Sequence, residues 1–210
     1  MDKINKENIA GVVLAGGRSS RMGFRDKALL ELRQKPLIEH VIANASGQVD
    51  QLILSVNKNQ QDYDYLELPL VEDLQRRYLG PLVGIHRAMT YFREQSSEHK
   101  YLACFPADTP IFPTNIVARL SQALQENKST FVCSRYRGQI EPLFSLWSLQ
   151  SEHEVEDCLK AEKYGPKLLL PILDSYVLDI EADDNGLFLN INTESALQKV
   201  ENLCARKNIL

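Results

Sequence analysis

The chain reads Leu14-Ala-Gly-Gly-Arg-Ser-Ser-Arg-Met-Gly-Phe-Arg-Asp-Lys27 directly after a short apolar run, Ile9-Ala-Gly-Val-Val13. A short apolar run flanked by polar residues is typical of a strand that is buried on both faces. Gly16 and Gly17 have no Cβ, so the backbone can turn tightly there and bring its N–H groups close to a ligand. The stretch therefore predicts a strand that ends in a ligand-binding loop.

Cations follow the glycines within this loop, among them Arg18, Arg21 and Lys27. Three positive charges suit a triphosphate better than a neutral ligand. The spacing fits neither a Walker A loop nor the Gly-x-Gly-x-x-Gly of dinucleotide-binding folds, because Met22 and Gly23 come too late. The alternative is an ordinary turn on a basic surface, with Lys27 in a surface ion pair. The whole string favours the phosphate-binding interpretation.

The bulk composition sets the class of protein. The 210 residues are 44% hydrophobic and 25% charged, with a net charge of −4, which indicates one globular domain and no overall basic field for nucleic acid or an anionic membrane. No apolar run reaches transmembrane length, and the N-terminus has no signal-peptide core. The four cysteines have no Cys-x-x-Cys spacing, which argues against a zinc site and for reduced thiols. We expect a cytoplasmic protein.

Strands and helices alternate in the first part of the chain. Strands are expected at residues 9–14, 51–56, 69–72 and 101–105, and helices from Pro36 to Gly47, from Gly80-Pro81 to Phe92 and from Pro113 to Leu124. This alternation predicts an α/β fold with a mostly parallel central sheet and helices on both faces. Because ligands of such sheets bind beyond the carboxyl ends of the strands, the loops that follow these four strands are expected to form one site.

The second part of the chain is less regular. Strands are expected at 130–134 and 140–147, joined by a hairpin, and again at 176–180 and 187–190. Helices are expected at 149–162, 167–173 and 194–203. No linker rich in Pro, Gly or Ser and no repeat divides the chain, so we expect one domain over residues 9–210 after a polar tail at 1–8.

Asp108 follows the fourth expected strand in Phe105-Pro-Ala-Asp-Thr-Pro110. A carboxylate at this place can hold Mg²⁺, which takes oxygen ligands and usually keeps waters and substrate phosphates. Such a metal offsets the charge that builds up as pyrophosphate leaves. The alternative is that Asp108 only caps the turn that enters the next helix. Together with the glycine loop, the metal interpretation is favoured.

Two further polar residues follow expected strands. Asp73 precedes Gly80-Pro-Leu-Val-Gly84, and its carboxylate could accept hydrogen bonds from a guanine edge or a ribose hydroxyl. Asn57 could both donate to a base and accept from it. The alternatives are a solvated loop acid at Asp73 and an ordinary turn residue at Asn57.

The glycine loop resembles the signature Leu-Ala-Gly-Gly-x-Ser-x-Arg-Met-Gly-x-Asp-Lys of nucleotidyltransferases, and among these the chain is most similar to the molybdenum cofactor guanylyltransferases. Lys35-Pro-Leu, Gly80-Pro-Leu-x-Gly, Pro-x-Asp-Thr-Pro and Asn-Ile-Asn-Thr follow in the order of that family. The resemblance spans nearly the whole chain. It implies a Rossmann-like, three-layer enzyme that transfers GMP from GTP to the phosphate of Mo-molybdopterin and releases pyrophosphate.

The resemblance also implies roles for individual residues. The implied GTP-binding residues are Leu14, Ala15, Gly16, Gly17, Lys27, Asn57, Asp73 and Asp108. Asp108 would also bind the Mg²⁺ cofactor and act with Lys27, Arg21 and Arg18 in catalysis. The residues implied to face molybdopterin are Glu141, Pro142, Asn190 and Asn192. Residues 9–128 would form the GTP-binding half and residues 129–210 the molybdopterin-binding half.

The asparagine pair has a second interpretation. Asn190 and Asn192 alternate with apolar Leu189 and Ile191, so in a strand both amides would face the same way and could read the edge of a pterin. The alternative is a strand end, with Asn192 or Thr193 capping the last helix. On the residues alone, the capping alternative is favoured.

Three other functions share the same features. A cytidylyltransferase acting on molybdopterin, or an enzyme that makes an activated sugar or alcohol, would have the same loop and the same metal-binding Asp. A non-catalytic delivery protein would bind GTP without releasing pyrophosphate. The choice of base rests on the resemblance, as does an expected transient contact with molybdenum cofactor biosynthesis proteins and acceptor molybdoenzymes.

Overall fold

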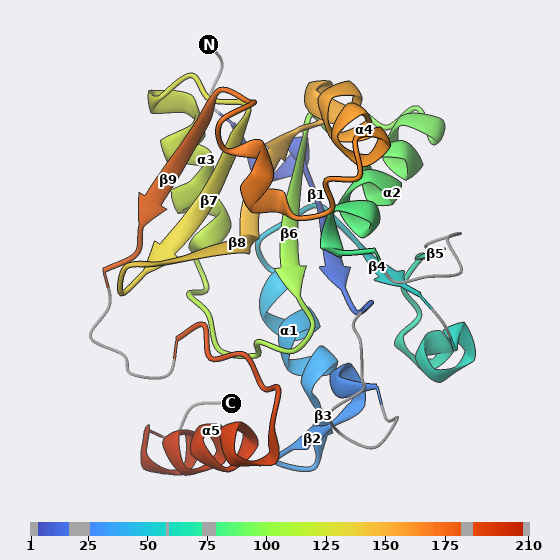
Figure 1. Ribbon diagram of the computed structural model, residues 1–210. Coiled ribbons are helices and arrows are strands. Elements are labelled where there is room, and N and C mark those ends of the chain that lie inside the picture. Colours follow the sequence, from blue (N-terminus) through green and yellow to red (C-terminus); the bar gives the residue numbers. More distant parts are fainter. Residues whose placement is uncertain (1–3, 17–25, 58, 73–78, 182–186, 208–210) are drawn as a thin grey trace.

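A computed structural model describes residues 4–16, 26–57, 59–72, 79–181 and 187–207. Its centre is a seven-stranded sheet with the strand order β5-β4-β1-β6-β8-β7-β9 (Figure 1). The strands are β1 (Ile9–Leu14), β4 (Gln51–Val56), β5 (Leu70–Glu72), β6 (Tyr101–Pro106), β7 (Phe131–Tyr136), β8 (Gln139–Ser148) and β9 (Ser175–Asp179).

The sheet is mostly parallel, as predicted. Strand β1 lies between β4 and β6 and is parallel to both, and β4 is parallel to β5. Strand β8 is antiparallel to β6 and to β7, whereas β9 is again parallel to β7. The carboxyl ends of β5, β4, β1 and β6 therefore meet at one edge of the sheet, where the sequence predicts the ligand.

Helices cover both faces of the sheet. They are α1 (Leu37–Ala45), α2 (Pro81–Glu94), α3 (Ile116–Glu126) and α4 (Glu152–Lys160), and a further helix, α5 (Glu194–Lys207), lies beyond the edge of the sheet. Because successive side chains of a strand point to opposite faces, Val13 of β1 packs in the core with α1 and α3, and Val12 packs in the core with α2 and α4. The α/β prediction with three layers is confirmed.

Two helices begin later than predicted. Pro36 lies in a small antiparallel ribbon of β2 (Glu31–Leu32) and β3 (Lys35–Pro36), and α1 starts at Leu37. Pro113 accepts a hydrogen bond from the N–H of Ile116 (3.2 Å) in a turn that precedes α3. In both cases the proline ends an extended or turned segment, and the helix follows it.

Two further predictions are wrong. Residues 167–173 form no α-helix: the short 3₁₀ helix η5 (Pro166–Leu169) is followed by turns, because Pro171 has no N–H to donate to a continuing helix. Residues 187–190 form no strand either, because Phe188 has a positive φ of 57°, which turns the chain. The predicted helix at 149–162 is present as η4 (Leu149–Ser151) and then α4.

The small elements were not predicted from the sequence. Besides the β2–β3 ribbon they are the 3₁₀ helices η1 (Lys6–Asn8), η2 (Lys27–Leu29) and η3 (Gln60–Leu66). Helix α5 lies beside the ribbon, below the sheet in the view of Figure 1. Val200 and Cys204 of α5 are buried in the core that contains α1. The C-terminal segment thereby returns to the edge of the sheet where β1 and β6 end.

Candidate active site

The loops after β1 and β4 touch at Gly16. The N–H of Ala15 donates to the carbonyl of Ser55 (2.9 Å), which continues the parallel pairing beyond β1. A Cβ on Gly16 would lie 2.6 Å from the side-chain amide carbon of Asn57, far closer than such carbons approach. A side chain at position 16 would therefore displace the Asn57 amide, and the two predicted nucleotide-binding residues lie together.

Lys27 is held at the start of η2. The carboxylate of Asp26 accepts from the N–H of Ala28 (3.2 Å) and caps this short helix. The ammonium of Lys27 donates to Oδ1 of Asn192. The lysine thus contacts an amide of the C-terminal segment, and among the ion pairs of the described residues none involves Lys27.

Asp108 lies where β6 ends beside β1. The N–H of Ala107 donates to the carbonyl of Leu14 (3.1 Å), so Asp108 stands at the predicted edge of the sheet. Burial raises the pKa of the Asp108 carboxyl above its usual range, and the nearby Lys27 ammonium opposes this shift. The Thr109 hydroxyl donates to Oδ1 of Asp108 (3.3 Å).

The capping alternative for Asp108 is excluded by where the next helix begins. Helix α3 starts at Ile116, and Asn115 occupies its N-cap position. Asp108 is therefore separated from the helix by a full loop, and its carboxylate stays at the edge of the sheet. Asp108 is therefore not the N-cap of α3.

The segment that carries Asn190 and Asn192 is bound to the Asp108 loop. The N–H of Phe188 donates to the carbonyl of Ile111 and the N–H of Ile191 donates to the carbonyl of Asp108, both at 2.9 Å. Asn190 lies beside Asp108, where its hydrogen bond helps to lower the pKa of that carboxyl. Although no strand forms, both asparagines reach the site, one toward Asp108 and one toward Lys27.

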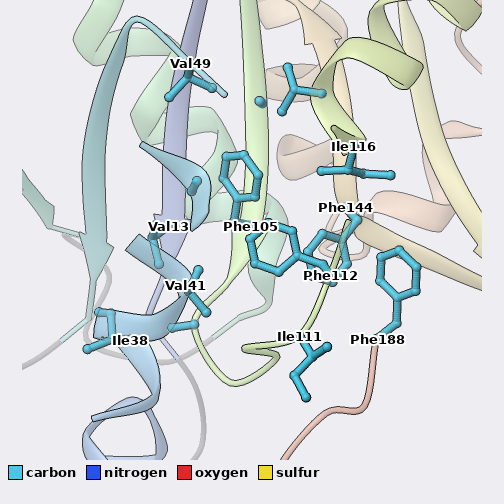
Figure 2. Packing of buried hydrophobic residues seen from close by; sticks show 14 of the residues in the cluster. Val13, Ile38, Val41, Val49, Phe105, Ile111, Phe112, Ile116, Phe144 and Phe188 are labelled. Carbon is cyan, nitrogen blue, oxygen red and sulfur yellow. The ribbon is translucent and has the colours of Figure 1, made fainter. Parts of the chain in front are cut away.

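A row of aromatic rings anchors this segment to the core (Figure 2). Phe112 lies 5.6 Å from Phe105 of β6 and 5.0 Å from Phe144 of β8, and Phe188 completes the row 4.7 Å from Phe144, measured between ring centroids. Such pairs add stabilisation beyond the burial of their area. This anchoring role of Phe188 was not predicted, because no local pattern of the sequence reveals it.

The comparison with known families agrees with this architecture. Residues 11–174 match the MobA-like NTP transferase domain. The chain belongs to the MobA-like family. The match begins in β1 and ends just before β9, so it includes Gly16, Lys27, Asp108 and Glu141.

Relatives of similar length support the same assignment. Proteins named molybdenum cofactor guanylyltransferase from Yersinia pestis (strain Pestoides F) and Yersinia pseudotuberculosis serotype O:1b (strain IP 31758) are each 33% identical to this MobA-like chain over 191 residues. Each alignment covers 89% of this chain and 91% of the relative.

Two solved structures share the fold. Molybdopterin-guanine dinucleotide biosynthesis protein A from Archaeoglobus fulgidus superimposes with a TM-score of 0.77 at 21% identity, over 94% of this chain and 99% of that one. The 4-diphosphocytidyl-2C-methyl-D-erythritol synthase from Anaerococcus prevotii DSM 20548 gives 0.73 at 14% identity, over 97% and 100%. The Rossmann-like nucleotidyltransferase fold is thus confirmed.

The Gly80-Pro-Leu-Val-Gly motif of this MobA-like domain starts α2. Gly80 has a φ of 144°, and a Cβ there would lie 2.6 Å from the carbonyl oxygen of Tyr164. The same carbonyl accepts from the N–H of Leu82 (3.2 Å). The motif therefore serves a close contact between α2 and the segment after α4. Gly17, Arg18, Arg21 and Asp73 lie outside the described residues.

Glu141 and Pro142 lie at a bulge in β8. Ser145 pairs with Cys133 and Glu141 with Ser134, so residues 142–144 have no partner in the ladder. A proline fits there because it has no N–H to give to the sheet. Burial raises the pKa of Glu141, and the ammonium of Lys167 opposes the shift. The Glu141 carboxyl thus lies close enough to Lys167 for the two charges to interact.

Thr193 is the residue that caps the last helix, which confirms the capping alternative for one of the two residues it named. Its hydroxyl accepts from the N–H of Ala196 (3.2 Å) at the start of α5. Asn192 instead contacts Lys27.

In the part of the chain that the structure describes, no group of three or more His, Cys, Asp and Glu side chains could hold a metal, and no helix is long and apolar enough to cross a membrane.

Proposed function

We propose that this MobA-like chain is a molybdenum cofactor guanylyltransferase, which transfers GMP from GTP to the terminal phosphate of Mo-molybdopterin and releases pyrophosphate. Relatives with this name are 33% identical over most of the chain. The observation that carries the proposal is the convergence of Lys27, Asp108 and the two asparagines at the ends of β1 and β6. Cations, a carboxylate and amides in one place suit a nucleotide with its metal.

GTP is assigned to the edge of the sheet where β4, β1 and β6 end. Ligands of doubly wound sheets bind at this kind of position. The described residues assigned to GTP are Leu14, Ala15, Gly16, Lys27, Asn57 and Asp108. Gly17, Arg18, Arg21 and Asp73 are assigned on the sequence alone.

The donor set at Asp108 fits Mg²⁺. The Asp108 carboxylate offers the hard oxygen ligands that Mg²⁺ prefers, and the remaining positions of the ion would go to water and substrate phosphate. A Mg²⁺ ion held by Asp108 would supply positive charge at the reacting phosphates. Binding of a cation would also favour the ionised carboxyl, against the effect of burial.

The chemistry requires positioning rather than a covalent intermediate. A terminal phosphate oxygen of the cofactor attacks the α-phosphorus of GTP in line, the bond to the bridging oxygen of the β-phosphate breaks, and pyrophosphate leaves with that electron pair. Lys27, with Arg18 and Arg21, neutralises the charge on the phosphates. Phosphoryl-group transfers depend mainly on such alignment and charge compensation.

The second substrate is assigned to the other side of the site. The residues proposed to face molybdopterin are Glu141, Pro142, Asn190 and Asn192. Residues 129–210 would then form the molybdopterin half and residues 9–128 the GTP half of one domain.

All four cysteines are free thiols, in keeping with a cytoplasmic enzyme. Transient contacts with molybdenum cofactor biosynthesis proteins and acceptor molybdoenzymes are part of the proposal.

Calorimetric titration of GTP, CTP and ATP with Mg²⁺ tests the nucleotide site. We expect GTP to bind most tightly and Lys27→Ala and Asn57→Ala to weaken it, while Asp179→Ala, which removes a surface partner of Arg135, leaves it unchanged. A preference for CTP would assign the chain to the cytidylyltransferases. If the folded protein binds none of the three nucleotides, the proposed nucleotide site is wrong.

Pyrophosphate release tests the reaction itself. We expect release from GTP only when Mo-molybdopterin is added. Release with a phosphorylated sugar or alcohol instead would indicate the other kind of nucleotidyltransferase. GTP binding without pyrophosphate release under any of these conditions would indicate a delivery protein.

A further inference from the structure

The contact between Lys27 and Asn192 joins residues 165 positions apart in the chain. We propose that Asn192 is a positioning residue for Lys27, and that its side-chain oxygen holds the Lys27 ammonium ready for the phosphates of GTP before any ligand binds. This inference rests on the proposed function and adds to it, because the resemblance assigns Asn192 to the other substrate. Asn192 would therefore act on both substrates.

Both partners of the contact are fixed by their surroundings. Lys27 lies in η2, which Asp26 caps, and the N–H of Leu37 donates to the carbonyl of Leu30 (2.8 Å) just after that helix. Asn192 follows Ile191, whose N–H is bound to the carbonyl of Asp108. A flexible lysine stem loses conformational entropy when it is fixed. Holding it in place beforehand reduces the cost of binding a phosphate.

An amide suits this task better than a carboxylate. A neutral oxygen accepts from the ammonium but leaves its positive charge for the phosphates, whereas an acid would neutralise it. Asp108 is an acid close enough to Lys27 for the ammonium to lower its pKa. Yet none of the ion pairs among the described residues joins the two. Asn192 thus keeps Lys27 available for phosphate and Asp108 available for a metal.

The contact leaves part of the amide for the second substrate. A carboxamide has one oxygen and two N–H groups, and Lys27 engages only the oxygen. Asn192 is partly exposed, so its N–H groups can still donate to a molecule bound beside it. Asn192 would thereby contact both Lys27, through its oxygen, and a bound molybdopterin, through its N–H groups.

GTP binding in the absence of molybdopterin separates this role from recognition of the pterin. The full chain is titrated with Mg²⁺ and GTP as wild type, Asn192→Ala, Lys27→Ala and the double variant. We expect Asn192→Ala to weaken GTP about threefold to tenfold, as for the loss of one hydrogen bond, and to have no further effect once Lys27 is alanine. The control Leu189→Ala removes an exposed apolar side chain of the same segment and should bind GTP as wild type does.

Two results of this cycle would overturn the inference. One is wild-type affinity for GTP in Asn192→Ala, and the other is an equal loss in the presence and absence of Lys27. If the wild-type protein itself fails to bind GTP, the proposed function fails instead. The two failures are therefore distinguishable.

A ligand-free measurement tests the contact directly. The NMR signal of the Lys27 ε-carbon is assigned by its loss in Lys27→Ala. We expect it to shift in Asn192→Ala and to stay in place in Leu189→Ala, with the dispersion of the other signals showing that each variant is folded. An unchanged Lys27 signal in folded Asn192→Ala contradicts the inference.

Discussion

The two sides of the site present different chemistry. The side formed by the ends of β1 and β6 carries full charges, on Lys27 and Asp108, whereas the C-terminal segment carries the neutral amides of Asn190 and Asn192. Asp108 comes shortly after β6, and Lys27 begins η2. The amides are brought to them by backbone hydrogen bonds and by the Phe188 anchor. We infer that Lys27 and Asp108 take part in the reaction, and that Asn190 and Asn192 align the reacting groups.

The largest effect is expected on the charged side. Asp108→Ala removes the carboxylate proposed to hold Mg²⁺, so kcat/KM for pyrophosphate release should fall by at least about a thousandfold, or ~4 kcal/mol. Far-UV circular dichroism should remain that of the wild type, because Asp108 lies in a loop. Asp179→Ala is the matched control, since it removes an acid that pairs with Arg135 at the surface. Substantial Mg²⁺-dependent activity in Asp108→Ala contradicts the assignment.

A smaller effect is expected where the two loops of the charged side touch. Gly16→Ala places a Cβ against the Asn57 amide and should lower the free energy of unfolding by about 1–3 kcal/mol, measured with denaturant. Adding Asn57→Ala opens the space and should restore stability but not GTP binding. The control is Gly47→Ala, where the nearest atom would lie at 3.9 Å. Full stability of Gly16→Ala would show that the loops do not pack in this way.

The charged side could be predicted because its signals are local. The strand at 9–14 is a continuous apolar run and the strand at 51–56 is mostly apolar, as expected of strands buried on both faces, and both match the observed bounds. A parallel sheet then places the residues after such strands at one edge. Gly16, Asn57 and Asp108 do lie at that edge. Their roles, like those of Arg18, Arg21 and Asp73, remain predictions.

The amide side could be predicted only in part. The alternation of Asn190 and Asn192 with apolar residues suggested a strand at 187–190, but Phe188 takes a left-handed backbone conformation there. Its ring contact with Phe144 and its hydrogen bond to Ile111 decide that turn, and both are tertiary contacts. The distant contact between Asn192 and Lys27 likewise leaves no local signal.

The pH dependence of GTP binding tests the role of Asp108 on the charged side. Only the ionised Asp108 carboxyl binds Mg²⁺, and burial raises its pKa. Mg²⁺-dependent GTP affinity should therefore fall as the pH drops, beginning above the usual aspartate value of about 3.9, by up to about tenfold per pH unit. The measurement is a calorimetric series over pH. In Asp108→Asn the part of this fall that comes from protonation of Asp108 should disappear, and only the part that comes from protonation of the GTP phosphates should remain. An identical pH profile in both proteins contradicts the role of Asp108.

The smallest effect is expected from Glu141, on the side assigned to molybdopterin. Glu141→Gln keeps the size of the side chain but removes a charge whose pKa burial raises and which lies near Lys167. We expect the KM for Mo-molybdopterin to rise less than about fivefold, with the KM for GTP unchanged. Glu39→Gln, at the Lys35 pair on α1, is the control and should alter neither value. A weaker binary complex with GTP would instead place Glu141 on the charged side, because a residue that faces only the second substrate has no reason to affect the first.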